Sequence, residues 1–505
     1  KVQTASAAKT VLQQLPSTLT QLSAAKQTLT SDADKENLDK GMADLINSTE
    51  RLVALINQPD QSKSLVKTVI QPLGDYYKGI DPKSLASKNL MNSAIKLSNA
   101  AITQAGTVNT SWDNVKIEQG GRVDLTPSPN QIIQAARNAA QTEAELETQL
   151  SESLEGGLEN AIISTVTLKM PDSLKNAPKT AAGLNAQTMT ALKDNNIEKV
   201  NLDLGAVSFG IDDKFIEAQQ STDLSFNVDR ERPLSEADRD RMPKGSHPVG
   251  APVVNLSATQ NKQANDTFNH PLDVSFHLDQ FDNVPKDPTS LGIFRLNEST
   301  NNWEPVGGVY DPATNSIHTK RTHLSKYTVL QSEKNYSNIE DSWAKNEIAS
   351  LKGKGIIEDD ELFTASDNVT REEFAGWIAK AYGLDSSTME TDLSDLDKDS
   401  PYYGAVAAAY QQGIISGKAD GTFDPKGDIS KEEMAVMIAS AMNKYDYTVD
   451  TNTFELAQYE EDLPTWAVNS VETVVENGAV DESFFGSAGS VTKEEAAAIL
   501  YQVYR

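Results

Sequence analysis

Three short clusters of polar residues share one order of residue types. They occupy 370–373, 430–433 and 492–495 and are Thr-Arg-Glu-Glu, Ser-Lys-Glu-Glu and Thr-Lys-Glu-Glu. In each cluster the Ser or Thr can cap the N-terminus of a helix, and the Glu three residues later can complete a capping box. The cation takes no part in that cap, and in the three clusters it is Arg371, Lys431 and Lys493.

The clusters belong to a longer repeat that fills the last third of the sequence. They are 60 and 62 residues apart (430 minus 370, 492 minus 430), and each precedes an apolar helix expected at 374–381, 434–442 and 496–503. A second helix is expected upstream of each cluster, ending at the glycine of 355–357, 413–415 and 478–480. Internal repetition at a fixed period indicates repeated structural units. The predicted units are 336–390, 391–450 and 451–505.

Acidic and aromatic residues recur in the same units. The first unit opens with Asp341 and Trp343 and the third with Asp462 and Trp466, while the second has an Asp and a Tyr in the equivalent stretch. The second unit also contains Asp-Gly-Thr-Phe-Asp-Pro at 420–425. Together with the polar clusters, this pattern resembles that of S-layer homology domains, in three copies over about 338–505.

The resemblance implies a fold, a ligand and a location. Three such repeats form a pseudo-threefold trimer of helical lobes, and the grooves between lobes bind the secondary cell wall polysaccharide of Gram-positive bacteria, often through a pyruvylated sugar. The resemblance therefore predicts a secreted protein of the cell wall or surface layer, with that polysaccharide as its partner and with self-association in a surface layer.

Carried over by position, the polysaccharide-binding residues are the three cations together with Asp341, Trp343 and Trp466. Two of the cations are lysines where the family more often has arginine, and lysine lacks the forked geometry that binds a carboxylate through two hydrogen bonds. Arg371, directly after the cap, is expected to be exposed. The structural alternatives are that the clusters serve only as helix caps and that the tryptophans serve only in packing.

A second motif lies upstream, in a strand-like stretch after Trp303 and Gly307-Gly308. His323 stands two residues before Ser325. This resembles the closing strands of autoproteolytic β-sandwich domains, which implies attack of a Ser hydroxyl on the preceding carbonyl while His takes its proton. The hypothesis is self-cleavage at Leu324-Ser325, and the alternative is a strand in which both side chains are structural.

The remaining sequence predicts the elements that carry these motifs. Leucines at helical spacing, including Leu12, Leu15, Leu19 and Leu22, predict an antiparallel bundle of four helices over 1–106. Short alternating or β-branched runs separated by turn residues fill 107–335, with one helix at 129–155. The predicted fold class is multidomain α+β: an N-terminal helical bundle, a central antiparallel β-sandwich region and a C-terminal all-α trimer of repeats. An alternative for the central region is two modules that join within 230–250.

Composition excludes several classes of function. The net charge is −28, and 336–505 alone holds 33 acidic against 12 basic residues, which is the wrong sign for nucleic acid. Cysteine is absent, so thiol catalysis and thiolate metal sites are excluded, and five histidines make a histidine metal site improbable. No cofactor is expected beyond Ca2+ loosely bound by the acidic surface.

No apolar run reaches the roughly 20 residues of a membrane span. The sequence starts at Lys1 without a signal peptide, which favours a processed or cytoplasmic chain.

These observations favour a structural surface protein anchored non-covalently to the wall, and not an enzyme. The alternative is a wall-tethered enzyme or adhesin whose active part is the middle region or lies outside this sequence. Five tryptophans in 505 residues are few for a sugar-cleaving groove.

Overall fold

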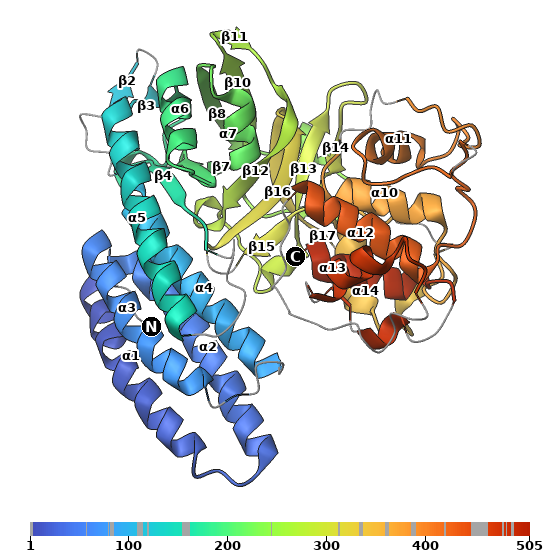
Figure 1. The fold of residues 1–505 in the computed structure, drawn as a ribbon. Coiled ribbons are helices and arrows are strands. Elements are labelled where there is room, and N and C mark those ends of the chain that lie inside the picture. The colour runs from blue at the N-terminus through green and yellow to red at the C-terminus, as the bar shows by residue number, and fades with distance from the viewer. Residues whose placement is uncertain are drawn as a thin grey trace. The chain divides into compact units, whose positions relative to one another are not determined.

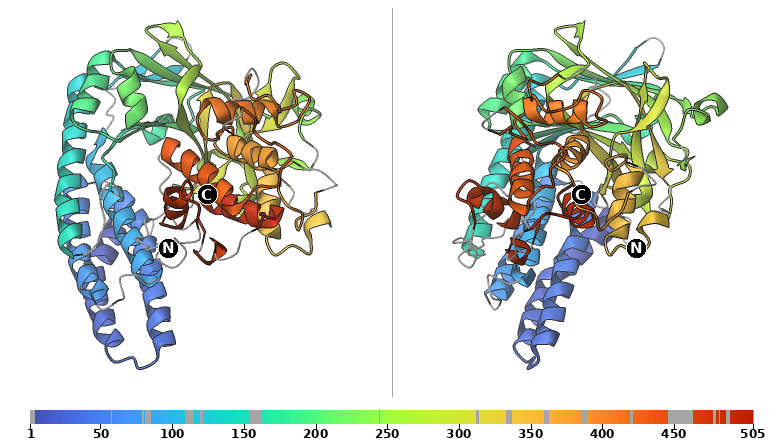
Figure 2. Two further views of the ribbon diagram at one scale, coloured as in Figure 1. Left: turned by 45° about the vertical axis from the view of Figure 1, so that its right-hand side comes forward. Right: turned by 90° about the vertical axis from the view of Figure 1, so that its right-hand side faces the viewer.

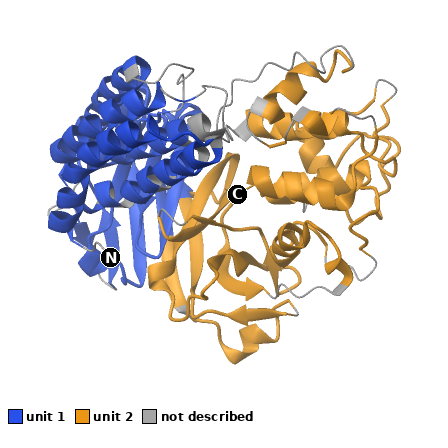
Figure 3. Cartoon of the chain, turned by 90° about the horizontal axis from the view of Figure 1, so that it is seen from below, with its two compact units in different colours: residues 1–227, 259–263 blue, residues 228–258, 264–505 orange. Residues whose placement is uncertain are grey.

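The computed structural model describes residues 4–56, 58–78, 80, 85–108, 115–118, 121–153, 162–243, 245–311, 314–332, 337–358, 363–384, 390–418, 421–445, 463–476, 479–480, 482–485 and 489–504. They form two compact units (Figure 3). Unit 1 comprises 1–227 and 259–263, and unit 2 comprises 228–258 and 264–505. The division along the chain falls after Asn227, close to the stretch 230–250 where a join between two modules is predicted.

Unit 1 begins with four long helices that lie side by side (Figures 1 and 2): α1 (Ala5–Lys26), α2 (Asp32–Ile56), α3 (Pro59–Tyr77) and α4 (Leu85–Ala105). Their buried faces follow helical spacing, because only one stripe of each helix meets its neighbours. Leu12, Leu15 and Leu19 are buried as expected. On α2 the buried stripe includes Ile46 and Val53, whereas the neighbouring Leu45 and Leu52 are half-buried.

The strands of unit 1 form two sheets that the helix α5 (Pro129–Ser153) connects along the chain. One has the order β1 (Thr107–Val108), β4 (Thr165–Lys169), β6 (Lys199–Asp203) and β7 (Val207–Asp212). The other contains β2 (Val115–Ile117), β3 (Arg122–Leu125), β5 (Lys179–Leu184) and the start of β8 (Leu224–Pro233). Two short helices, α6 (Ala186–Asp194) and α7 (Asp213–Gln219), were missed from the sequence.

The prediction of antiparallel strands needs correction in unit 1. The pairs β1 with β4, β4 with β6, and β3 with β5 are parallel. Parallel neighbours need a long crossover connection, and α5 and α6 lie within the connecting segments. The multidomain α+β class is confirmed.

The strands of unit 2 pair antiparallel wherever their register is defined. β12 (Thr267–His277), β16 (Ser316–His323) and β15 (Val309–Asp311) form one set. The other consists of β14 (Asn302–Pro305), β13 (Leu291–Asn297), β17 (Lys326–Ser332), β10 (Pro252–Gln260) and β9 (Ser246–Pro248), together with the end of β8. The short helix α8 (Glu236–Arg239) follows β8.

Short helices complete unit 2: α9 (Lys345–Gly353), α10 (Arg371–Ala381), α11 (Tyr403–Gln411), α12 (Lys431–Tyr445), α13 (Val468–Glu476) and α14 (Lys493–Tyr504). They come in pairs, which we call the first (337–384), second (390–445) and third (463–504) helical segments. One hydrophobic core joins all three segments and also includes Val309 of β15. Among the described residues, no helix is long and apolar enough to span a membrane.

Candidate functional site

The three helical segments meet in a closed ring of backbone hydrogen bonds. The N–H of Val369 donates to the carbonyl of Val491 (2.9 Å), that of Val491 to Ile429 (3.1 Å), and that of Ile429 to Val369 (3.1 Å). All three side chains are fully buried. Each segment therefore gives one bond and receives one, as expected for three equivalent units around a common axis.

Each polar cluster begins directly after this ring and caps a helix. Thr370 Oγ1 accepts from the N–H of Glu373 (3.3 Å), and Glu373 Oε2 accepts from the N–H of Thr370 (2.8 Å). The same two bonds join Ser430 with Glu433 and Thr492 with Glu495. The prediction that the clusters are capping boxes is confirmed, because both members of each pair satisfy a backbone donor at a helix start.

The three cations do not point freely into solvent, because each reaches the neighbouring segment. Arg371 Nε donates to the carbonyl of Phe423 (2.9 Å), and its guanidinium lies 4.8 Å from the centre of that ring. Lys431 Nζ donates to the carbonyl of Phe484 (2.7 Å) and lies 4.6 Å from its ring centre. Lys493 Nζ lies 5.5 Å from the ring centre of Phe363. The first segment thus contacts the second, the second the third, and the third the first, each through a cation–π contact.

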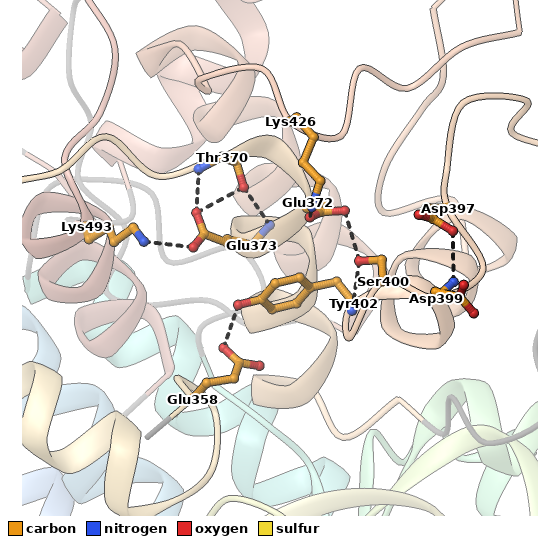
Figure 4. A network of polar contacts seen from close by, with 10 residues as sticks. All are labelled: Glu358, Thr370, Glu372, Glu373, Asp397, Asp399, Ser400, Tyr402, Lys426 and Lys493. Atoms are coloured by element: carbon orange, nitrogen blue, oxygen red, sulfur yellow. Dashed lines mark hydrogen bonds and ion pairs between the residues drawn. The ribbon is translucent and has the colours of Figure 1, made fainter. Parts of the chain in front are cut away.

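Cap glutamates complete two of these contacts. Arg371 Nη1 pairs with Glu433 Oε1 at 2.7 Å, and Lys493 Nζ pairs with Glu373 Oε1 at 2.8 Å (Figure 4). One carboxylate oxygen therefore caps the helix while the other holds the cation of the adjacent segment. The Arg371 side chain is only 7% exposed, so the expectation that it is exposed is wrong. Its position after the cap faces the interface between segments and not solvent.

Two further cluster glutamates, Glu372 and Glu494, also bridge segments, and Figure 4 shows the contacts of Glu372. Glu372 accepts from Ser400 Oγ (3.0 Å) and pairs with Lys426 of the second segment. Glu494 accepts from Ser342 Oγ of the first segment at 2.6 Å. A third carboxylate, Glu358, lies beyond the cluster and accepts from Tyr402 OH (2.9 Å), Trp377 Nε1 and Lys380. Burial, and then the adjacent Glu358 carboxylate, raise the pKa of Tyr402 well above its usual range.

The two tryptophans predicted to bind polysaccharide are exposed. Trp343 is 65% exposed and Trp466 is 59% exposed, directly before α9 and α13. Asp341 is also exposed, whereas Asp462 lies outside the described residues. Ser342, which stands between Asp341 and Trp343, donates to Glu494, which follows Lys493 at the start of α14.

Some residues of the site were missed from the sequence. The three phenylalanines under the cations were not predicted as site residues, although each stands eight or nine residues before a cluster cation in its own segment: Phe363, Phe423 and Phe484. That recurrence was an available signal. What periodicity does not reveal is that each ring contacts the cation of another segment. The bridging Ser342 and Ser400 carry no such signal.

No group of three or more His, Asp or Glu side chains that could hold a metal ion is found within the described ranges. In the second segment, the carboxylate of Asp395 binds backbone N–H groups of the same segment. Asp395 accepts from the N–H groups of Phe423 and Asp424, both at 2.7 Å. Hydrogen bonding from Lys418 lowers the pKa of Asp424.

The self-cleavage motif lies at the turn from β16 to β17. The N–H of Leu324 donates to the carbonyl of Asp266 (2.8 Å), and Ser325 is buried. His323 Nδ1 is buried and has no hydrogen-bond partner among the described residues, and its carbonyl accepts from Tyr327 OH (2.6 Å). Self-cleavage here stays a prediction, which denaturing electrophoresis of freshly purified protein would check.

The helical segments and the strands of unit 2 share a buried contact. Tyr504, in the last turn of α14, accepts from the N–H of Gly308 at 2.6 Å, and its ring is buried. The N–H of Gly307 donates to the carbonyl of Lys354 (3.2 Å). Both glycines have positive φ (93° and 126°), and a Cβ on Gly307 would lie 2.5 Å from the Tyr504 hydroxyl. Gly307 thus makes room for the tyrosine, and Gly308 makes room for Ile317.

Comparison with known proteins bears on the same region. Residues 336–375 and 392–435 match the S-layer homology domain family. The amylopullulanase of Thermoanaerobacterium thermosulfurigenes is 30% identical over 254 residues, 47% of this chain and 13% of its own length. Exoglucanase XynX of Acetivibrio thermocellus is 31% identical over 182 residues, 34% of this chain and 16% of its own.

A cellulosome-anchoring protein of Acetivibrio thermocellus is 29% identical over 147 residues, 28% of this chain and 32% of its own length. The chain thus spans about a third or less of each of these relatives. The amylopullulanase match covers a larger share of this chain than 336–505 does, so it includes residues outside the helical segments. The chain carries an S-layer homology domain, which identifies it as a cell-surface, wall-associated bacterial protein.

Proposed function

We propose that this is a structural protein of a bacterial surface layer, or one associated with such a layer, and that three S-layer homology repeats hold it non-covalently on a secondary cell wall polysaccharide. The third helical segment is the third repeat. The N–H groups of Lys493 and Glu494 donate to Asp367 and Ala365, just as those of Arg371 and Glu372 donate to Gly427 and Pro425. The closed ring of hydrogen bonds at Val369, Ile429 and Val491 is the observation that carries the proposal.

The contact between the third and first segments is the best candidate for sugar binding. The third segment supplies the Lys493 ammonium, 16% exposed, and the first supplies the exposed Trp343 ring and Asp341. The ring can stack on the apolar face of a sugar, and the cation can bind a carboxylate such as that of a pyruvyl group. Arg371 and Lys431 are more deeply buried, so they act mainly by joining the segments at the other two contacts.

Sedimentation of the whole chain with isolated cell walls tests this proposal. The whole chain is required because Tyr504 is buried against the strands, and an isolated 336–505 would lose that contact. We expect binding to walls that retain polysaccharide and no binding to stripped walls. Trp343→Ala should weaken binding about tenfold or more, as expected for loss of a stacking contact worth about 1.5 kcal/mol. It should leave the melting temperature unchanged because the side chain is exposed.

Val284→Ala is the matched control, since Val284 is 41% exposed and lies outside the helical segments. Equal binding of both variants, or equal binding to stripped walls, would contradict the anchoring proposal. Ca2+-dependent assembly into sheets, seen by electron microscopy, would support the layer-forming role, self-association and the loose binding of Ca2+.

The alternative function is a wall-tethered enzyme or adhesin. The observation that favours it is the match to amylopullulanase, which extends beyond the helical segments. Release of reducing sugar from pullulan by the purified chain would establish this alternative, and its absence together with sheet assembly would favour the structural role.

A further inference from the structure

The strand β2 of unit 1 is the last strand of its sheet and has one open edge. It pairs with β3 on one side (Figure 1), and no other described strand pairs with it on the other. The N–H of Glu118 donates to the carbonyl of Arg122, after β2, at 2.8 Å. Bonded and non-bonded positions alternate along an antiparallel pair, so Lys116 also bonds to β3, whereas the N–H and C=O of Ile117 point to the open edge. Such unpaired backbone groups can accept a further strand.

The same edge presents an apolar side chain. Ile117 is 56% exposed, although Val123, opposite it on β3, is only 2% exposed. The apolar face of the sheet therefore continues to the edge and ends there with an uncovered isoleucine. A single exposed isoleucine needs no explanation on its own. Here it coincides with free backbone groups, and one added strand would cover both.

The strand at the other end of the same sheet order has a protected edge. The N–H of Trp303 on β14 donates to the carbonyl of Arg241 at 2.9 Å, and β14 ends at Pro305, which has no N–H to donate. Proline and a covering segment are common means of protecting an edge strand. Residues 115–117 contain no proline, and the Ile117 side chain stays exposed.

The charges of β2 make it complementary to a second copy of itself. Lys116 and Glu118 lie on one face of the sheet, 66% and 40% exposed, with Nζ 3.0 Å from Oε1. If two β2 strands pair antiparallel about a two-fold axis at Ile117, residue 116 of each copy lies opposite residue 118 of the other. Opposite charges in such cross-strand positions are stabilising. An axis at 116 or 118 would oppose like charges, so charge selects the register.

We infer that β2 is a self-association edge, through which two copies of this chain pair antiparallel about a two-fold axis at Ile117. The N–H of Ile117 in each copy donates to the carbonyl of Ile117 in the other, and two ion pairs between Lys116 and Glu118 join the copies. A lysine alone at an edge discourages an incoming strand. Glu118 makes the same lysine attractive for this one pairing. The inference rests on the self-association included in the proposed function and names a surface for it.

Chemical trapping of the whole chain in solution tests this inference, because the sequence contains no cysteine. Ile117→Cys gives each copy one thiol, at positions whose Cα atoms would be about 5.5 Å apart in the pair. A short bifunctional thiol reagent should link these copies about tenfold or more faster than those of Val284→Cys, since the pairing holds the thiols together. Val284 is a surface control, 41% exposed and in unit 2.

Two further sets of variants separate specific pairing from collision. Val115→Cys is the control on β2 itself, because its two thiols would be about 13 Å apart along the strands and should not be linked. In the Ile117→Cys chain, Lys116→Glu and Glu118→Lys should each lower trapping about tenfold or more, since like charges then oppose each other. Mixing these two variants should restore trapping, as linked dimers that contain one copy of each, which mass spectrometry identifies.

Equal trapping of Ile117→Cys, Val115→Cys and Val284→Cys would overturn the inference. Charge reversals without effect, or a mixture that does not recover trapping, would do the same. Trp343→Ala, which tests wall binding, should leave trapping unchanged, and the assay contains no cell walls. Failure of trapping therefore leaves the wall-anchoring proposal standing, and failure of sedimentation with walls leaves the pairing of β2 standing.

Discussion

The helical bundle of unit 1 and the three helical segments of unit 2 are both built from helices, but they are stabilised in different ways. Helices α1 to α4 are 22, 25, 19 and 21 residues long, whereas α9, α11 and α13 have nine residues each. Isolated helices shorter than about 12–15 residues are marginal in water. The long helices can therefore rely on apolar stripes, while the short ones need caps, ion pairs and ring contacts with specific partners.

This difference explains why the helical segments have a recognisable sequence motif and the bundle does not. A long apolar stripe can be built from many combinations of apolar side chains, so the bundle shows only regularly spaced leucines. Short helices held by polar contacts require given residue types at given positions, which produces a recognisable repeat. In the bundle a comparable polar contact occurs within the core, where Asp39 Oδ1 accepts from Lys26 Nζ and Tyr76 OH, both at 2.6 Å.

The largest expected effect comes from removing a ring that a cation covers. Phe423→Ala should destabilise unit 2 by about 3–5 kcal/mol, because it leaves a cavity in the core and removes the surface under Arg371. Urea unfolding followed by circular dichroism measures this loss. Leu19→Ala in α1 is the matched change, and we expect it to destabilise unit 1 by about 2–5 kcal/mol and to leave wall binding unaltered. Loss of wall binding in Leu19→Ala would break the comparison.

Removing the cation itself should have a smaller effect. Arg371→Met is expected to destabilise unit 2 by about 2–3 kcal/mol, since Glu433 loses its charged partner and Phe423 loses a donor to its carbonyl. The double variant with Glu433→Gln should be less destabilised than the sum of the two single changes. Additive unfolding free energies would mean that Arg371 and Glu433 do not act as a pair.

Removing a helix cap should have a smaller effect on stability, and the effect should differ between the helical segments and the bundle. Thr370→Ala should cost about 1 kcal/mol, because the Thr370 hydroxyl is half of a capping box at an interface between segments. Thr4 caps α1 through the N–H of Ala7 at 3.3 Å, at an exposed helix end. Thr4→Ala should therefore cost at most a few tenths of a kcal/mol, because fraying there exposes little apolar surface. Equal losses in thermal unfolding would show that helix length does not set the dependence on caps.

The last effect concerns pH and unit 1. Burial, and then the nearby Glu198 and Glu147 carboxylates, raise the pKa of Glu143 on α5 to about 7. Burial also raises the pKa of Glu198, and the nearby charge of Asp213 acts in the same direction. Between the ordinary pKa of a glutamate and 7, the folded chain holds a proton that the unfolded chain has lost. Stability should therefore fall as the pH rises through this interval and then become level.

Glu143→Gln should remove this fall without lowering the stability at acidic pH. Melting temperatures of both chains at pH 5 and pH 8 measure it. Equal pH dependence in the two chains would assign the titration to other groups.

The sequence predicts the order of elements well and the three-dimensional pairing less well. Helix starts such as Thr370 and the strand-forming runs of unit 2 follow from local chemistry, so they are correctly placed. The parallel pairing of β4 with β6 depends on how distant segments cross over, which no local pattern specifies. For the same reason the sequence identifies Arg371 as a functional candidate but does not reveal that Glu433 and Phe423, from another segment, enclose it.

The contact between Tyr504 and Gly308 has a consequence for the order of folding. Unit 2 begins near residue 228. It is completed by Val491, which closes the ring of backbone hydrogen bonds, and by the helix α14 that follows. During synthesis the strands around Gly308 emerge long before Tyr504 leaves the ribosome, and domains fold as units. Unit 2 therefore cannot close before Tyr504 has emerged. Its strands stay without their final cover until translation has passed Tyr504, so truncation just before that residue should affect the strands as much as the helices.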